Sequence, residues 1–174
     1  IDTLDYSGTG LNQGSKLVIA AAGKIKRDLM SILPTSYSLP AGYSEACVVM
    51  PGVVAIKGPP AGEGHVQQVN EFCLTLDNDH SMHSFPLIVI VDESQPLANN
   101  LNEFLWVTFT RSNPAVDVHG LGASTNNKHW GCTGSLVIDA RRKPHHAPLL
   151  EVDAKTSSQV DNIASSGHAI SRYL

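Results

Sequence analysis

Charged side chains are scarce in this sequence, and the net charge is small. Asp, Glu, Lys and Arg make up 16% of the 174 residues, whereas about 25% is usual in a soluble domain. The net charge is −4, which argues against a protein that binds nucleic acid through phosphate contacts. The shortage of charge indicates that part of the surface faces another protein rather than water.

Long apolar runs and paired cysteines are also absent. No uninterrupted apolar segment approaches the roughly 18 residues that a membrane-spanning helix needs, so we expect no membrane span. Cys47, Cys73 and Cys132 lie far apart and form no CxxC pair, which gives no disulfide framework and favours free thiols in a reducing cytoplasm. The chain begins with Ile1 and not with Met, and we interpret it as a piece of a longer chain.

The sequence does contain alternating extended and helical patterns. Short apolar runs predict strands over residues 46–57 (broken at Pro51-Gly52), 86–92, 115–119 and 135–138. Apolar residues three and four positions apart predict helices over residues 15–32, 66–76, 99–111 and 157–174. Gly and polar residues predict loops over residues 1–14 and 121–132.

This alternation favours an α/β fold with a mainly parallel sheet flanked by helices, and with a C-terminal helical tail. We divide the chain into an α/β domain, residues 1–155, of which 1–14 form a lead-in loop, and a C-terminal helix, residues 156–174. Ligands of such sheets bind beyond the carboxyl ends of the strands. Asp92 and residues 139–141 occupy such positions.

Two groups of residues resemble ligand sites only loosely. Gly8-Thr9-Gly10 with Gly14 lacks the buried strand that precedes a phosphate-binding turn. A second group offers the oxygen and imidazole ligands that can hold a divalent ion: Asp77, Asp79, His80 and His83. These four residues precede a predicted strand, and a solvated polar loop is the favoured interpretation.

Basic and nucleophilic residues give no complete active site either. His145 and His146 are adjacent, so their side chains point in different directions. Residues 141–143 form a basic run that could meet an anion but is typical of an exposed surface, and only Arg141 directly follows a predicted strand. The chain has no GxSxG elbow and no cysteine in a recognisable nucleophile context.

Residues 100–114, NLNEFLWVTFTRSNP, preceded by IVIVD at 88–92, resemble the C-terminal part of the UbiD family of reversible decarboxylases. The family pattern is N-x-x-E-x-x-W-A-x-x-T-R followed by a proline, after a strand that ends in acidic residues. MPGVVAI at 50–56 and GSLVIDA at 134–140 are similar to two further family strands. Val107 stands where the family often has Ala, and residues 125–133 depart from the pattern.

The resemblance implies a carboxy-lyase that acts on aromatic or α,β-unsaturated carboxylic acids. It also implies prenylated FMN, a divalent metal ion and potassium as cofactors. In the family, these groups and a Glu-Arg-Glu catalytic network belong mainly to preceding domains, which no segment of this chain matches. We therefore expect no catalytic, cofactor-binding or metal-binding residue in this chain, and no activity from it alone.

The resemblance further implies that the chain shapes one side of the substrate pocket and forms a homo-oligomer, a dimer or higher. It implies contacts with the missing N-terminal domains, and residues 156–174 as an oligomerisation arm. The residues that match the ends of family elements are candidates for lining the pocket: Thr110, Arg111, Asp139, Ala140 and Arg141.

Two of these candidates have simpler roles, and the whole chain has a simpler interpretation. Thr110 could bond back to its own helix. Arg111 could neutralise the C-terminus of that helix or pair with Asp117. The chain as a whole could be a free-standing α/β ligand-binding or oligomerisation module without enzymatic activity. The reading frame upstream of Ile1 would separate the two interpretations.

Overall fold

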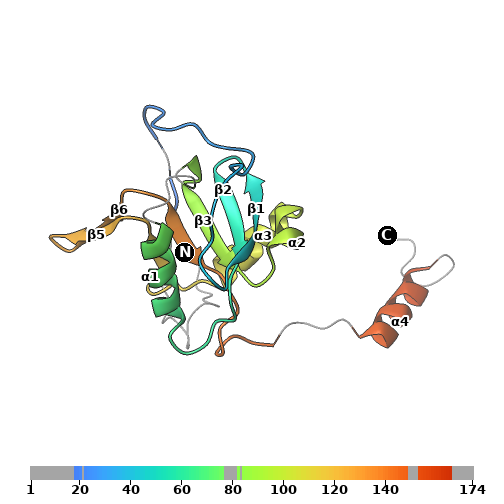
Figure 1. The fold of residues 1–174 in the computed structure, drawn as a ribbon. Helices are drawn as coiled ribbons and strands as arrows, with labels where there is room; N and C mark the ends of the chain where they lie inside the picture. The colour runs from blue at the N-terminus through green and yellow to red at the C-terminus, as the bar shows by residue number, and fades with distance from the viewer. Residues whose placement is uncertain (1–17, 21, 77–81, 83, 149–152, 166–174) are drawn as a thin grey trace.

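The structure is a computed structural model that describes residues 18–20, 22–76, 82, 84–148 and 153–165 (Figure 1). Its helices and strands, in chain order, are β1 (Ser44–Met50), β2 (Val53–Lys57), α1 (His65–Leu76), β3 (Leu87–Val91), α2 (Ser94–Ala98), α3 (Leu101–Thr110), β4 (Val118–Gly120), β5 (Ala123–Asn126), β6 (His129–Cys132), β7 (Leu136–Asp139) and α4 (Ala154–Ala164).

A five-stranded sheet in the order β1-β2-β3-β7-β4 forms the centre of the fold (Figure 1). The central strands β2, β3 and β7 are parallel, whereas the outer strands β1 and β4 run antiparallel to their neighbours. The predicted α/β class is confirmed, and the sheet is mixed. Because the central strands are parallel, Lys57, Val91 and Asp139 end them at the same edge of the sheet.

Helices cover both faces of this sheet, as the sequence predicts. Ile88 and Ile90 of β3 join the core cluster that contains the buried side of α1. Val89 and Val91 join the opposite cluster, with residues of α2 and α3. A strand buried on both faces has no polar side, which explains the continuous apolar run of β3.

Most of the predicted elements lie where their patterns place them. The run that is broken at Pro51-Gly52 forms the hairpin β1–β2, and the turn residue Gly52 has a positive φ of 78°. Helices α1 and α3 and strands β3 and β7 are confirmed. Asn100 caps α3, since its side chain accepts a hydrogen bond from the Glu103 amide at 3.2 Å. The three cysteines form no disulfide with one another.

The helix predicted over residues 15–32 is wrong for its described part, residues 18–20 and 22–32, which contain no helix. The apolar residues of the predicted helical stripe do not pack into a core, since Ile25 and Ile32 are 90% and 73% exposed. The segment is instead tied to the β1–β2 turn, where the Gly52 amide donates to the Met30 carbonyl at 2.9 Å. Periodicity alone does not make a helix when tertiary contacts favour another path.

The loop predicted over residues 121–132 is also wrong, because β5 and β6 form an antiparallel hairpin there. Asn127 and Lys128 at its tip have φ values of 48° and 67°, as a two-residue hairpin turn requires. Strand β4 begins and ends later than the predicted strand over 115–119, and α2 is a short helix in a segment for which the sequence analysis predicts no element.

The C-terminal helix is confirmed over its described part. It begins earlier than predicted, after Asp153, whose side chain accepts a hydrogen bond from the Thr156 amide at 2.8 Å. None of the residues of α4 is buried. The lead-in loop 1–14 and residues 166–174 lie outside the described residues. In the described part of the chain, no helix has both the length and the apolar character to cross a membrane.

Candidate functional site

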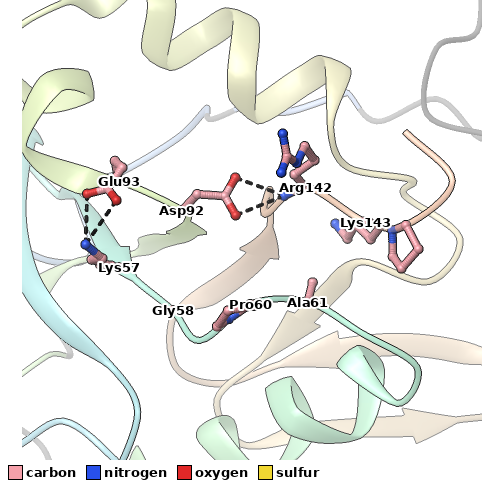
Figure 2. A pocket seen from close by; sticks show the side chains of 9 residues that line it. Lys57, Gly58, Pro60, Ala61, Asp92, Glu93, Arg142 and Lys143 are labelled. Carbon is pink, nitrogen blue, oxygen red and sulfur yellow. Dashed lines mark hydrogen bonds and ion pairs between the residues drawn. The ribbon is translucent and has the colours of Figure 1, made fainter. Parts of the chain in front are cut away.

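A cavity of about 420 Å³ lies at the sheet edge where β2, β3 and β7 end (Figure 2). The chain reaches this edge three times, so residues distant in the sequence meet there. The charged residues that line it are Lys57, Asp92, Glu93, Arg142 and Lys143. This is the edge at which ligands bind in open α/β sheets, and the position predicted for Asp92 is confirmed.

Asp92 lines both this cavity and a second cavity of about 420 Å³ beside α3. Its Oδ2 accepts hydrogen bonds from Arg111 Nη1 at 2.9 Å and from the Arg142 amide at 3.0 Å. Arg111 therefore pairs with Asp92 and not with Asp117. One carboxylate thus fixes the end of α3 and the turn after β7 relative to β3.

Lys57 and Arg142 are the two cations of the first cavity that are accessible to solvent, whereas Lys143 is buried. Lys57 donates to both oxygens of Glu93, at 2.9 and 3.0 Å, and these bonds raise the pKa of its ammonium. The Arg142 guanidinium forms no ion pair with the described residues, and only its backbone amide is bonded to Asp92 (Figure 2). Arg142 is thus the side chain of this cavity that is available to an anionic ligand.

Behind the cavity, Arg141 and Asp139 form a wholly buried ion pair. Arg141 Nε and Nη2 donate to the two oxygens of Asp139 at 2.8 and 2.9 Å. Arg141 Nη1 donates to the Pro59 carbonyl at 2.6 Å and to Gln68 Oε1 at 3.1 Å. This one guanidinium connects β7, the loop after β2 and helix α1.

Lys143 is a third buried charged residue, next to Asp139 and Arg141. Its Nζ donates to the carbonyls of Arg111 at 3.0 Å and Asp139 at 2.5 Å, and lies 3.2 Å from Asp117 Oδ2. Burial lowers the pKa of Lys143, against the attraction of both carboxylates. Burial alone would raise the pKa of Asp139, but the hydrogen bonds from Arg141 and the charge of Lys143 outweigh it and hold the pKa below its usual value.

We expect the stability of this region to fall in mild acid because of His146. Burial, aided by the charges of His145, Lys143 and Arg111 and opposed by Asp117, lowers the pKa of His146 to about 4. An unfolded histidine has a pKa of about 6.5, so the unfolded chain binds one more proton between these values. The free energy of unfolding is then lost as the pH falls from about 6.5 towards 4, by about 1 kcal/mol at pH 4.5, because solvent screens the charge of this partly exposed ring.

Urea unfolding midpoints at pH 7 and pH 4.5 measure this loss. His146 Nδ1 accepts a hydrogen bond from the Lys143 amide at 3.1 Å, so protonation there removes a bond as well as burying a charge. His146→Gln should flatten the pH dependence, whereas His129→Gln on the exposed strand β6 should leave it intact. An unchanged slope in His146→Gln would contradict the assignment.

The five residues predicted to line a substrate pocket lie in different environments. Arg111 lines the second cavity. Thr110 donates back to the Trp106 carbonyl at 2.7 Å, as its simpler interpretation expects. Asp139, Ala140 and Arg141 are wholly buried in this chain. The structure therefore brings Arg111 together with Asp92, and places Asp139 and Arg141 behind the cavity.

The sequence analysis placed Arg142 only in the basic run 141–143 and Asp117 only as a possible partner of Arg111, and it did not name His65 or His119 as functional residues. No local pattern in the sequence separates Arg142 from Arg141. In the structure Asp139, Ala140, Arg141 and Lys143 are buried, and Arg142 is the exposed residue of this turn. The clusters predicted from Gly8-Thr9-Gly10 with Gly14 and from residues 77–83 fall on segments that lie outside the described residues, apart from Met82.

Comparisons with known proteins identify long relatives of this chain. A protein of Chlamydia pneumoniae that is named as a subunit of 4-hydroxybenzoate decarboxylase is 33% identical over 91% of this chain. Uncharacterised proteins of Chlamydia muridarum and Chlamydia trachomatis are each 32% identical over 92% of it. The chain spans only 26% of the length of each of these relatives.

Two further comparisons add little to this result. Vanillic acid decarboxylase of Sedimentibacter hydroxybenzoicus in its open form aligns with 65% of this chain, at a TM-score of 0.39 and 21% identity, and 26% of that structure is covered. No family model matches the sequence. The chain is therefore related to one part of a longer protein that is named as a decarboxylase subunit.

Proposed function

We propose that this chain is the C-terminal part of a UbiD-family reversible decarboxylase of aromatic or α,β-unsaturated carboxylic acids. One observation carries the proposal: the chain aligns, over 91% of its length, with 26% of the Chlamydia pneumoniae protein that is named as a 4-hydroxybenzoate decarboxylase subunit. The order of the motifs at 50–56, 88–92, 100–114 and 134–140 supports the same family. The chain would then contribute assembly contacts and part of the substrate pocket, and would not be active alone.

The cavity at the sheet edge supports a role in holding an anionic substrate. Arg142 offers a guanidinium that no described carboxylate neutralises, and a guanidinium can bind a carboxylate through two parallel hydrogen bonds. Arg111 lies on the other side of Asp92, in the second cavity. In this proposal Arg142 and Arg111 face the substrate side, whereas Asp139, Ala140 and Arg141 support the turn that carries Arg142.

The described residues do not fit the phosphate of prenylated FMN. Asp92 and Glu93 line the same cavity as Arg142, and Lys57 is already paired with Glu93. A phosphate group would meet two carboxylates and one uncompensated cation there. We therefore assign the cofactor, with its divalent ion and potassium, to the rest of the longer protein.

Exposed apolar side chains support the assembly role. The outer side of α3 exposes large apolar residues: Leu101, Leu105, Trp106 and Phe109. Helix α4 exposes Val160 and Ile163. Apolar side chains that gather on one surface are typical of contacts with other protein chains or domains, and here they would meet other subunits or the remaining domains.

The test compares the complete protein encoded by the gene with this chain alone. Both are supplied with prenylated FMN and incubated with 4-hydroxybenzoate and a panel of unsaturated acids, and product is followed by chromatography. We expect turnover by the complete protein and none by residues 1–174. Turnover by this chain alone would overturn the proposed division of roles, and a complete protein that is inactive on every acid would favour the non-enzymatic module.

A substitution in the complete protein tests the cavity separately. Arg142→Ala should raise KM about tenfold to a hundredfold, the value of a lost charge-assisted hydrogen-bond pair. Lys128→Ala, at the tip of the exposed β5–β6 hairpin, is the matched control and should leave KM unchanged. Equal KM values for the wild type and Arg142→Ala would remove Arg142 from the substrate site without touching the family assignment.

A further inference from the structure

The outer side of α3 is an apolar surface that the rest of the described chain leaves open to solvent. The inner side of the same helix is packed, since Phe104 and Val107 belong to the core cluster on the sheet. The exposed residues are therefore not needed to hold α3 on the sheet. We call them the α3 face, and their exposed fractions are 50% for Leu101, 41% for Leu105, 66% for Trp106 and 47% for Phe109.

The α3 face is large for a surface without a partner. At these exposed fractions the four side chains present about 400 Å² of apolar surface, which is the size of the largest and often functional patch of a monomeric protein. Trp106 is the most exposed of the four, and tryptophan is among the residues that contribute most to binding energy at protein interfaces. The face is therefore suited to contact another apolar protein surface.

The spacing of the residues makes the α3 face complementary to itself. Leu101, Leu105 and Phe109 are four positions apart, so they form one row along the helix, and Trp106 lies beside the central residue. Rows of this spacing on two helices interdigitate in the commonest class of helix packing. Because the row extends one turn to each side of Leu105, it can pack against a copy of itself about a two-fold axis at Leu105.

Charge and side-chain size favour an antiparallel pair of helices. Glu103 is the only charged residue of α3. In a parallel pair, the two Glu103 carboxylates would lie close together and the two helix dipoles would repel each other. An antiparallel pair places these carboxylates at opposite ends. It also sets Leu101 of each copy beside Phe109 of the other, so a smaller side chain meets a larger one at both ends.

The area and the lack of charge indicate the kind of partner. A standard interface buries about 800 Å² on each side, and transient pairs bury less. The α3 face supplies about half of that area, which suits a reversible pair whose formation depends on concentration. None of its four residues is charged, so a second α3 face matches it better than a charged ligand or a nucleic acid does.

We propose that α3 packs antiparallel against α3 of a second copy of this chain, with Leu105 at the two-fold axis. The proposal rests on the assembly role proposed above and assigns that role to one surface and one partner. Its test uses neither substrate nor cofactor, so its failure would leave the decarboxylase assignment in place.

Sedimentation equilibrium of this chain measures the association. We expect the mass to rise from one copy to two as the concentration increases. Leu105→Glu should weaken the dimer at least tenfold, because it brings two carboxylates together at the two-fold axis. Leu74→Glu is the matched control on α1, where Leu74 is 66% exposed, and it should leave the dissociation constant unchanged. Circular dichroism checks that both variants fold.

Two further substitutions test the antiparallel direction. Leu101→Lys and Phe109→Glu should each weaken the dimer, because each puts an unpaired charge into an apolar contact. The double variant should associate more tightly than either single variant, because each new ammonium would then face the new carboxylate of the other copy. A double variant that associates more weakly than both would overturn the antiparallel arrangement.

Two results would overturn the proposal as a whole. One is a wild-type chain that stays monomeric up to about 1 mM, because the α3 face would then be left for the rest of the longer protein. The other is a dimer whose dissociation constant is the same in the wild type and in Leu105→Glu, because the copies would then meet through another surface.

Discussion

Replacing Asp139 by alanine is expected to lower the free energy of unfolding by about 3–5 kcal/mol. The substitution leaves the Arg141 guanidinium buried without the two hydrogen bonds, at 2.8 and 2.9 Å, that balance its charge. It also removes a carboxylate beside the buried ammonium of Lys143. Urea unfolding at pH 7, followed by circular dichroism, measures the loss.

Two further variants separate the buried charge from the loss of a side chain. Asp139→Leu combined with Arg141→Met removes both charges at similar volume, and should cost much less than Asp139→Ala alone. Glu93→Ala breaks the exposed pair with Lys57 and should leave the midpoint nearly unchanged, because water and salt screen such pairs. If Asp139→Ala were as mild as Glu93→Ala, the buried network would not stabilise the fold.

Replacing Phe104 by alanine is expected to cost about 3–5 kcal/mol as well. Phe104 is 2% exposed and lies in the core cluster between α3 and the sheet. The substitution loses the free energy gained when the aromatic ring is buried away from water, and it leaves a cavity next to Val89 and Val91 of β3. The same unfolding measurement detects the loss.

The same helix provides a matched control for Phe104. Phe109→Ala removes the same side chain from a position that is 47% exposed, so its cost should be much smaller. In the complete protein, by contrast, Phe109→Ala should weaken assembly if α3 contacts a partner. Equal losses from the two substitutions in the isolated chain would contradict the way in which α3 is packed.

The centre of the fold was predictable because its signals are local. Strand β3 is an apolar run of five residues, of which four are β-branched and buried, and α3 has a capping Asn100 and an apolar stripe. These features need no knowledge of distant residues. The segment 18–32 has an apolar stripe too, but whether such a stripe finds a core depends on the rest of the chain, and here it does not.

The candidate site was less predictable because it depends on side-chain direction. Asp139 and Arg141 were identified by their place at the end of a strand, and in the structure Asp139 is the last residue of β7 and Arg141 follows two positions later. Which of Arg141 and Arg142 points into the core is decided by the pleat of β7, and the sequence alone leaves that choice open. His65 and Asp117 are brought together only by the packing of α1 on the sheet, which no local pattern encodes.

The parallel arrangement of β2, β3 and β7 also constrains the order of folding. Strands β1 and β2 pair across a short turn, whereas β3 must wait for a partner that follows it by a long stretch of chain, since Leu87 pairs with Leu136. Closing such a loop costs entropy before any contact repays it. Until β7 pairs with it, one edge of β3 has unpaired backbone hydrogen-bonding groups, and β3 is the most apolar strand of the sheet. Such an exposed edge can pair with another chain, so aggregation competes with folding.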